Sequence, residues 1–188
     1  MGKFAVFLLF MSFSVNASAP FGLSWGDNLN QYGEVVGPQT ELKVKTEVLP
    51  KPLSIASYYI LRGNQELGLL EVSMKSQFYS IYDDSFKEDF NFVKNSLSEI
   101  GYQTSEFVPS EVSSYKCVLQ GSCSGKRWYA ELDDGTHVAL EQLVKNRKDG
   151  FIQLVFKSPQ QVKIEAQLEA ELTSKVQDNR VSDKSAFD

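Results

Sequence analysis

The chain has 188 residues and a formal net charge of -5, and 42% of its residues are hydrophobic. This length predicts one domain with a real core, and the apolar content excludes an intrinsically disordered chain. The negative charge argues against nucleic acid and anionic lipid as partners, because neither attracts an acidic surface.

The first pattern along the chain is that of a secretory leader. Lys3 precedes an almost unbroken apolar run from Phe4 to Phe13, and small residues follow. The pattern predicts a signal peptide over residues 1–17, with an alternative cut after Ala19. The run is shorter than the ~20 residues of a spanning helix, so an uncleaved anchor is the weaker alternative. We therefore expect an exported protein, periplasmic or secreted, that does not insert into the membrane after cleavage.

The segments that follow predict the first part of a sheet. Asp27 or Asn28 caps a short predicted helix, and residues 41–48 suggest a weak strand. Residues 53–61 and 66–74 are two β-rich runs around a Gly-Asn turn. This arrangement is typical of a β-hairpin.

A helix is predicted in the middle of the chain, after a candidate strand at residues 78–82. Ser85 and Glu88 form a capping-box pattern that begins this helix, and Gly101 ends it. Apolar residues at helical spacing give it one face that packs on a sheet; they are Phe86, Phe90, Val93, Leu97 and Ile100.

The last third of the chain predicts a second hairpin, a buried strand and a final helix. Residues 126–132 and 136–143 flank an Asp-Asp-Gly turn, and residues 151–156 form a continuous apolar run. A capped start at Ser158-Pro159 favours a helix to Val176, although the alternation of its residues alone suggests a strand. Residues 177–188 are expected to form a flexible polar tail.

These elements together predict an α+β fold in a single domain over residues 20–176. Consecutive hairpins predict an antiparallel sheet. We expect a central amphipathic helix and a C-terminal helix to pack on it.

The order of the motifs resembles that of small exported bacterial envelope proteins that open with an F-G-x-x-x-G segment. Here the segment runs from Phe21 to Gly26, and Gly101-Tyr102 ends the central helix. A Trp-led strand at Trp128 and an Asp-Gly turn at Asp134-Gly135 follow, and then a final apolar strand. The resemblance implies an α+β domain of the cell envelope and brings no catalytic residues with it.

The two cysteines, Cys117 and Cys123, are predicted to form a structural disulfide. Thiols so close together in an oxidising compartment usually pair, and Gly121 lets the chain fold back. Free thiols are the main alternative. A redox pair would have closer spacing, and a zinc site would need more ligands than the single histidine, His137, can supply.

The residues that could carry catalysis have simpler local explanations. His137 is placed beside a turn as a surface residue. The carboxylate pairs Asp83-Asp84 and Asp133-Asp134 fit a helix start and a turn. We therefore predict no catalytic residues, no metal site and no cofactor.

A binding surface is the more informative prediction. Arg127, Trp128 and Tyr129 follow the predicted disulfide loop and are the residue types that dominate protein interfaces. Phe92 lies off the apolar stripe of the central helix, so it is expected to be exposed and to meet a partner or a covering segment. The alternative is a purely structural role, in which Trp128 belongs to the core.

The function expected from the sequence is that of an exported, non-enzymatic binding protein of the cell envelope. Its partner would be another envelope or secreted protein, in an adaptor, inhibitor or immunity role, and a homo-oligomer stays open. The alternative is a periplasmic binder of a small apolar or sugar ligand, and a carboxylate-based hydrolase is a third hypothesis.

Overall fold

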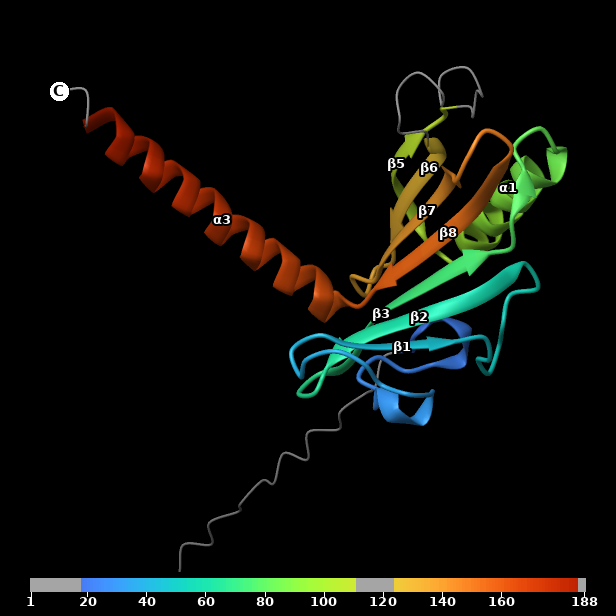
Figure 1. Cartoon of the computed structure of the whole chain (residues 1–188), viewed down its shortest axis with the longest axis horizontal. Coiled ribbons are helices and arrows are strands. Elements are labelled where there is room, and N and C mark those ends of the chain that lie inside the picture. The colour runs from blue at the N-terminus through green and yellow to red at the C-terminus, as the bar shows by residue number, and fades with distance from the viewer. Residues whose placement is uncertain (1–17, 111–123, 186–188) are drawn as a thin grey trace, which may run out of the picture.

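The computed structural model describes residues 18–110 and 124–185 (Figure 1). Within them the chain forms one antiparallel sheet of eight strands with two α-helices, so the predicted α+β fold is confirmed. The predicted signal peptide and both cysteines lie outside the described residues. The elements, in chain order, are the 3-10 turns η1 (Pro20–Gly22) and η2 (Leu29–Gln31), then β1 (Leu42–Thr46), β2 (Ala56–Asn64), β3 (Gly68–Ser76), β4 (Tyr79–Ser80), α1 (Asp84–Glu99), β5 (Gln103–Val108), β6 (Ser124–Glu131), β7 (His137–Val144), β8 (Asp149–Lys157) and α3 (Pro159–Ser185).

The central strand of the sheet is β8, the last in the sequence. The strand order is β1-β2-β3-β8-β7-β6-β5, and the short β4 pairs with the start of β8. On one side Phe156 lies opposite Val72 of β3, and on the other Leu154 lies opposite Leu140 of β7. The final apolar run of the sequence therefore joins the two predicted hairpins into one sheet.

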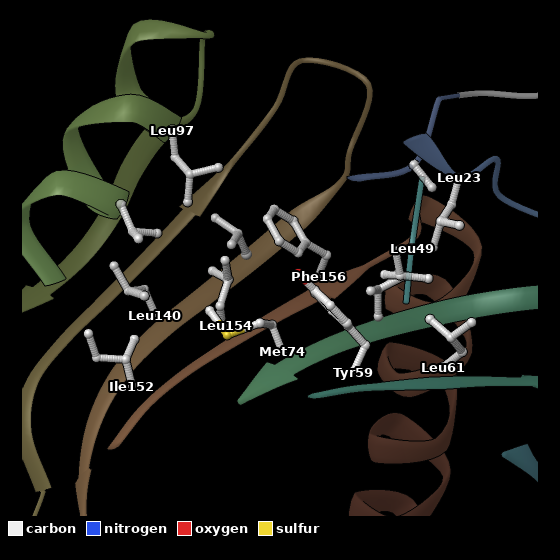
Figure 2. Close-up of a cluster of buried hydrophobic side chains, with 14 of the residues drawn as sticks. Leu23, Leu49, Tyr59, Leu61, Met74, Leu97, Leu140, Ile152, Leu154 and Phe156 are labelled. Carbon is white, nitrogen blue, oxygen red and sulfur yellow. The ribbon is translucent and has the colours of Figure 1, made fainter. Parts of the chain in front are cut away.

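Strict alternation along β8 gives the sheet a core face and an open face. Ile152, Leu154 and Phe156 are buried, whereas the residues between them are half-buried. Successive strand residues point to opposite faces, so this pattern places every second side chain in the core. Figure 2 shows Leu154 and Phe156 among the buried side chains, with Leu97 of α1 on one side and Leu23 of the N-terminal segment on the other.

Two separate elements cover the core face. α1 contacts β4, β7 and β8 through its buried stripe, and η2 contacts β1 and β2 at the other end of the sheet. Of the five stripe residues predicted from the sequence, four are buried; Ile100 is 70% exposed because α1 ends at Glu99. The cover over β8 is therefore divided between α1 and the N-terminal segment.

The N-terminal segment depends on backbone conformations that glycine favours. Gly22 and Gly26 have φ angles of 79° and 87°, in the left-handed region that side chains rarely adopt. These are the two glycines of the F-G-x-x-x-G segment, and between them Trp25 is buried. Phe21 is in the same region, with a φ of 61°, although it carries a large side chain. The surrounding contacts must stabilise this unfavourable conformation.

Several boundaries differ from the sequence prediction. The central helix begins at Asp84 with Asp83 as its N-cap, so the predicted capping box of Ser85 and Glu88 is wrong. The short helix predicted after Asp27 is only the 3-10 turn η2. The final helix continues through residues 177–185, which were expected to form a tail. That stretch has no glycine or proline to end the helix.

Candidate functional site

An apolar groove of about 570 Å³ lies on the core face, between α1 and the N-terminal segment. Leu154 and Phe156 of β8 lie at its base, and both side chains are almost fully buried between α1 and the N-terminal segment. The groove thus follows directly from the divided cover. Its further lining residues come from α1 (Phe92, Val93, Ser96, Leu97), from the helix end (Ile100, Tyr102), from the N-terminal segment (residues 18–21), from Leu53 and from the β6–β7 turn (Leu132, Asp134).

The N-terminal wall of the groove is held by aromatic contacts. The Phe21 ring lies 5.0 Å from the Tyr59 ring and 5.7 Å from the Phe156 ring, measured between centroids. Its backbone carbonyl accepts a hydrogen bond from the Lys51 amide at 3.0 Å. These contacts offset the unfavourable φ angle of Phe21, which suggests that the position of this ring matters.

The rim of the groove exposes large apolar side chains. Phe92 is 61% exposed and Ile100 is 70% exposed, and both lie on the groove side of α1 or just beyond its end. The sequence analysis predicted an exposed Phe92, and the structure places it at this rim. Exposed apolar groups around a hollow are typical of a surface that another molecule covers.

One end of the groove is polar. Tyr102 is buried against Phe156 with 6.0 Å between ring centroids, and Asp134 lies on the turn beside it. Burial, together with the negative charge of Asp134, raises the pKa of Tyr102 to about 12. The phenol is therefore neutral at physiological pH and keeps its hydroxyl hydrogen.

The structure does not bring the other predicted binding residues to this site. Trp128 is buried on the core face, and its indole Nε1 donates to Thr104 Oγ1 at 2.8 Å. Arg127 and Tyr129 are half-buried on the open face, where the Tyr129 hydroxyl donates to Glu141 Oε1 at 2.6 Å. The three predicted residues of β6 are therefore distributed over both faces of the sheet, and Phe92 lies apart from them on α1.

The candidate acid and base residues have structural partners. Asp83 Oδ1 accepts from the Ser85 amide at 3.1 Å, and Asp134 Oδ1 accepts from the Thr136 amide at 2.8 Å. These are the cap and turn roles predicted from the sequence. His137 lies 3.3 Å from Glu131 on the surface.

Two smaller hollows lie on the open face, where α3 leaves the sheet. The larger, of about 390 Å³, contains Arg62 and Glu71, which form an ion pair with each other. Among the described residues no group of three or more His, Cys, Asp or Glu is placed to hold a metal ion. No helix in the described part of the chain is both long and apolar enough to cross a membrane.

Comparison of the chain with protein-family models, with curated proteins and with solved structures finds no match. The assignment of a function therefore depends on the groove itself. Sequence reasoning identified Phe92 but missed the rest of the lining, because those residues read as ordinary core positions.

Proposed function

We propose that the protein is an exported, non-enzymatic binding protein whose groove between α1 and the N-terminal segment holds a small apolar ligand. The observation that carries this proposal is the 570 Å³ groove with its aromatic and aliphatic lining. Ligand pockets in proteins span about 300–1,000 Å³ and are mostly apolar with few polar groups. Tyr102 and Asp134 supply such groups at one end of the groove.

The lining favours an apolar ligand over a sugar. A sugar buries many hydroxyl groups, and each one left without a partner costs free energy. The residues at the base of the groove, Leu154 and Phe156, have no polar side-chain atoms to offer, and neither does Phe92 at the rim. A hydrocarbon chain or ring system gains free energy simply by leaving water.

The first experiment is native mass spectrometry of the protein purified from its own host, followed by titration with the neutral apolar fluorophore phenylnaphthylamine. We expect bound ligand mass, and a fluorescence increase that the native ligand competes away. Phe92→Ser with Ile100→Ser should weaken probe binding by about tenfold, as expected when two apolar contacts of about 0.7 kcal/mol each are lost. Val48→Ser, at a residue 79% exposed elsewhere, is the matched control. Equal binding by all three proteins would overturn the proposal.

A second candidate function is recognition of a partner protein, in an adaptor, inhibitor or immunity role. The observation that favours it is the exposure of Phe92 and Ile100, since aromatic and aliphatic anchors at a rim are typical of protein interfaces. Cross-linking in the native envelope, followed by affinity capture, tests it. One dominant partner, retained by the Val48→Ser control and lost with Phe92→Ala, would favour this function over small-ligand binding.

A further inference from the structure

The helix α3 projects from the domain without a cover. Figure 1 shows it leaving the sheet after β8 and pointing away from the body. Only its first turns border the sheet, and every residue from 166 to 177 is exposed. This stretch includes three large apolar side chains, Leu168, Leu172 and Val176, which are 51–63% exposed.

The three apolar residues form one stripe, because residues four apart lie on the same side of a helix. Most helical stability in proteins comes from packing an apolar face and not from the intrinsic helix propensity of the residues. The stripe of α3 therefore requires a surface to pack on.

The open face of the sheet offers such a surface in the same molecule. Opposite the core face, the adjacent residues Ile60, Ser73, Val155, Ala139 and Tyr129 form a row across five neighbouring strands. Most of these are apolar, and the four outside β3 are only half-buried. Apart from the first turns of α3, no described helix covers this face.

The end of the open face that lies farthest from α3 is positively charged and aromatic. Lys75 Nζ lies 3.9 Å from the Phe151 ring centroid, and Lys145 Nζ lies 4.4 Å from that of Phe78. Lys45 Nζ lies 4.3 Å from the Tyr58 centroid. We name these six residues the lysine–aromatic patch.

The charge of the patch is not balanced within the described part of the chain. None of its three lysines forms an ion pair with a described carboxylate, whereas Arg62 and Lys157 at the opposite end are paired with Glu71 and Glu165. In a protein with net charge -5, an uncompensated cationic and aromatic surface is a candidate for an acidic partner.

The exposed part of α3 has the complementary properties. At 100° per residue, Glu169 and Glu171 lie on either side of its apolar stripe, and neither forms an ion pair with a described residue. Lys175 also lies beside the stripe, so the two carboxylates and one ammonium of residues 166–177 give a net charge of -1. Twelve helical residues span about 18 Å, and the row of five residues crosses four inter-strand spacings, about 19 Å in all. The helix therefore matches the open face in length, in apolar character and in charge.

We propose that two copies of the chain exchange their α3 helices, so that each helix lies on the open face of the other copy. The apolar stripe would pack on the row through Val155, and Glu169 and Glu171 would approach the lysine–aromatic patch. A two-fold axis repeats the contact, so each helix–face contact needs to bury only about 800 Å² of a standard interface of about 1,600 Å².

Two other arrangements are less favourable. A helix cannot cover its own sheet while it points away from it, as in Figure 1. A symmetric antiparallel pair of α3 helices centred on Leu172 would place Glu169 opposite Lys175 of the other copy, but it would leave the open face of both sheets uncovered. Exchange onto the open face covers both the stripe and that face. The helix pair does not use the lysine–aromatic patch, so Lys75→Glu/Lys145→Glu would leave that pair unchanged.

The test is sedimentation of the full mature chain at micromolar concentration. We expect a dimer that dissociates with a Kd at least about tenfold higher in Leu168→Glu/Leu172→Glu. The Val48→Glu variant, which adds a negative charge at an exposed site outside both surfaces, should remain a dimer. A monomeric wild-type chain, or a dimer that the α3 variant leaves unchanged, would overturn the proposal.

A charge-exchange experiment separates this contact from a folding defect. Glu169→Lys/Glu171→Lys and Lys75→Glu/Lys145→Glu should each be weaker dimers alone, because helix and patch then carry the same sign. In an equimolar mixture, both contacts of the mixed dimer again join opposite charges, so mixing should restore the dimer. Failure of the mixture to associate better than its components would show that the helix does not meet the patch.

Discussion

Trp128 and Tyr129 are neighbours in β6 that belong to different environments. Trp128 is 1% exposed among the core side chains, and Tyr129 is half-buried on the open face. Alternation along a strand separates the two environments by a single residue. The residue types alone, which suggested an interface at both positions, do not distinguish them.

We predict that Trp128→Ala lowers the free energy of unfolding by about 3–5 kcal/mol, because it leaves a large cavity in the core. Tyr129→Ala should cost less than half as much, since its ring already contacts solvent. Urea denaturation of both variants measures the difference. Equal costs would mean that β6 does not present these faces as described.

Trp128, which was central to the binding surface predicted from the sequence, is thus a poor probe of binding. Trp128→Ala would weaken any interaction simply by destabilising the domain. Phe92 is the better probe, because its side chain is 61% exposed and contributes little to the core. The sequence could separate Phe92 from its helical stripe, since the stripe is local. It could not assign the faces of β6, because that assignment depends on where α1 and the N-terminal segment lie.

At the scale of elements, the start of α1 shows how neighbouring polar residues compete for one role. Asp83, Asp84 and Ser85 are all residue types that can cap a helix. In the structure Asp83 has the extended conformation of an N-cap, and its carboxylate also suits the positive end of the helix dipole.

We predict that Asp83→Ala lowers the free energy of unfolding by about 1 kcal/mol, and that Ser85→Ala changes it by less than about 0.5 kcal/mol. Ser85 is the residue that the capping-box pattern selected, so the pair distinguishes the two assignments. Thermal or urea unfolding at neutral pH is sufficient. A larger loss at Ser85 would restore the capping-box interpretation.

The first turns of α3 are anchored by charge. Lys157 Nζ donates to Glu165 Oε2 at 2.7 Å, and Gln161 Nε2 donates to Glu165 Oε1 at 3.0 Å. Partial burial raises the pKa of Glu165, but these hydrogen bonds and the nearby positive charge lower it by a larger amount. The net pKa therefore lies below the usual 4.5. The ionised carboxylate is the form that the folded state favours.

A carboxylate whose pKa is lower in the folded state stabilises the fold at pH values above its unfolded-state pKa. This contribution disappears as the pH falls through its folded-state pKa. We predict that Glu165→Gln costs less than about 1 kcal/mol at neutral pH, because the pair is partly exposed. The cost should decrease as the pH falls through the lowered pKa of Glu165, because the carboxylate is then protonated. Glu169→Gln, one turn further along α3, removes the same charge without removing a hydrogen bond to Lys157, and it serves as the control in dilute solution. A cost that is independent of pH would contradict the role of the Lys157 contact.

Some elements were accessible from the sequence and others were not, for identifiable reasons. The strands β2, β3, β7 and β8 have dense apolar or β-branched content, and α1 has a clear helical stripe. By contrast, β5 is polar and almost wholly exposed, so it has no apolar signal and was not predicted. Its backbone is nevertheless ordered by pairing with β6, a long-range interaction that local patterns do not encode.

At the scale of the whole molecule, the candidate site results from the packing of segments that are far apart in the sequence. The groove lies between two covers from opposite ends of the sheet, with Leu154 and Phe156 at its base. No single motif in the sequence marks it. Its walls come from residues 18–21, from α1 and from the β6–β7 turn, and only the sheet brings these segments together.

The central position of β8 predicts that the sheet unfolds as one unit. β8 pairs with β3 on one side and with β7 on the other, so neither half can lose its strands without exposing the shared core. The two tryptophans report on different halves: Trp25 is buried in the N-terminal segment, and Trp128 is buried in β6.

We predict that Trp25→Phe and Trp128→Phe, each with a single remaining tryptophan, give coincident unfolding transitions by fluorescence and by circular dichroism. Coincidence of probes is the signature of two-state unfolding. Each substitution shifts the midpoint, so the comparison is made between the two probes within one variant. A fluorescence transition of Trp25 that precedes the circular dichroism transition would show that the N-terminal wall of the groove detaches first. The groove would then open before the sheet unfolds, and its ligand would stabilise that wall in particular.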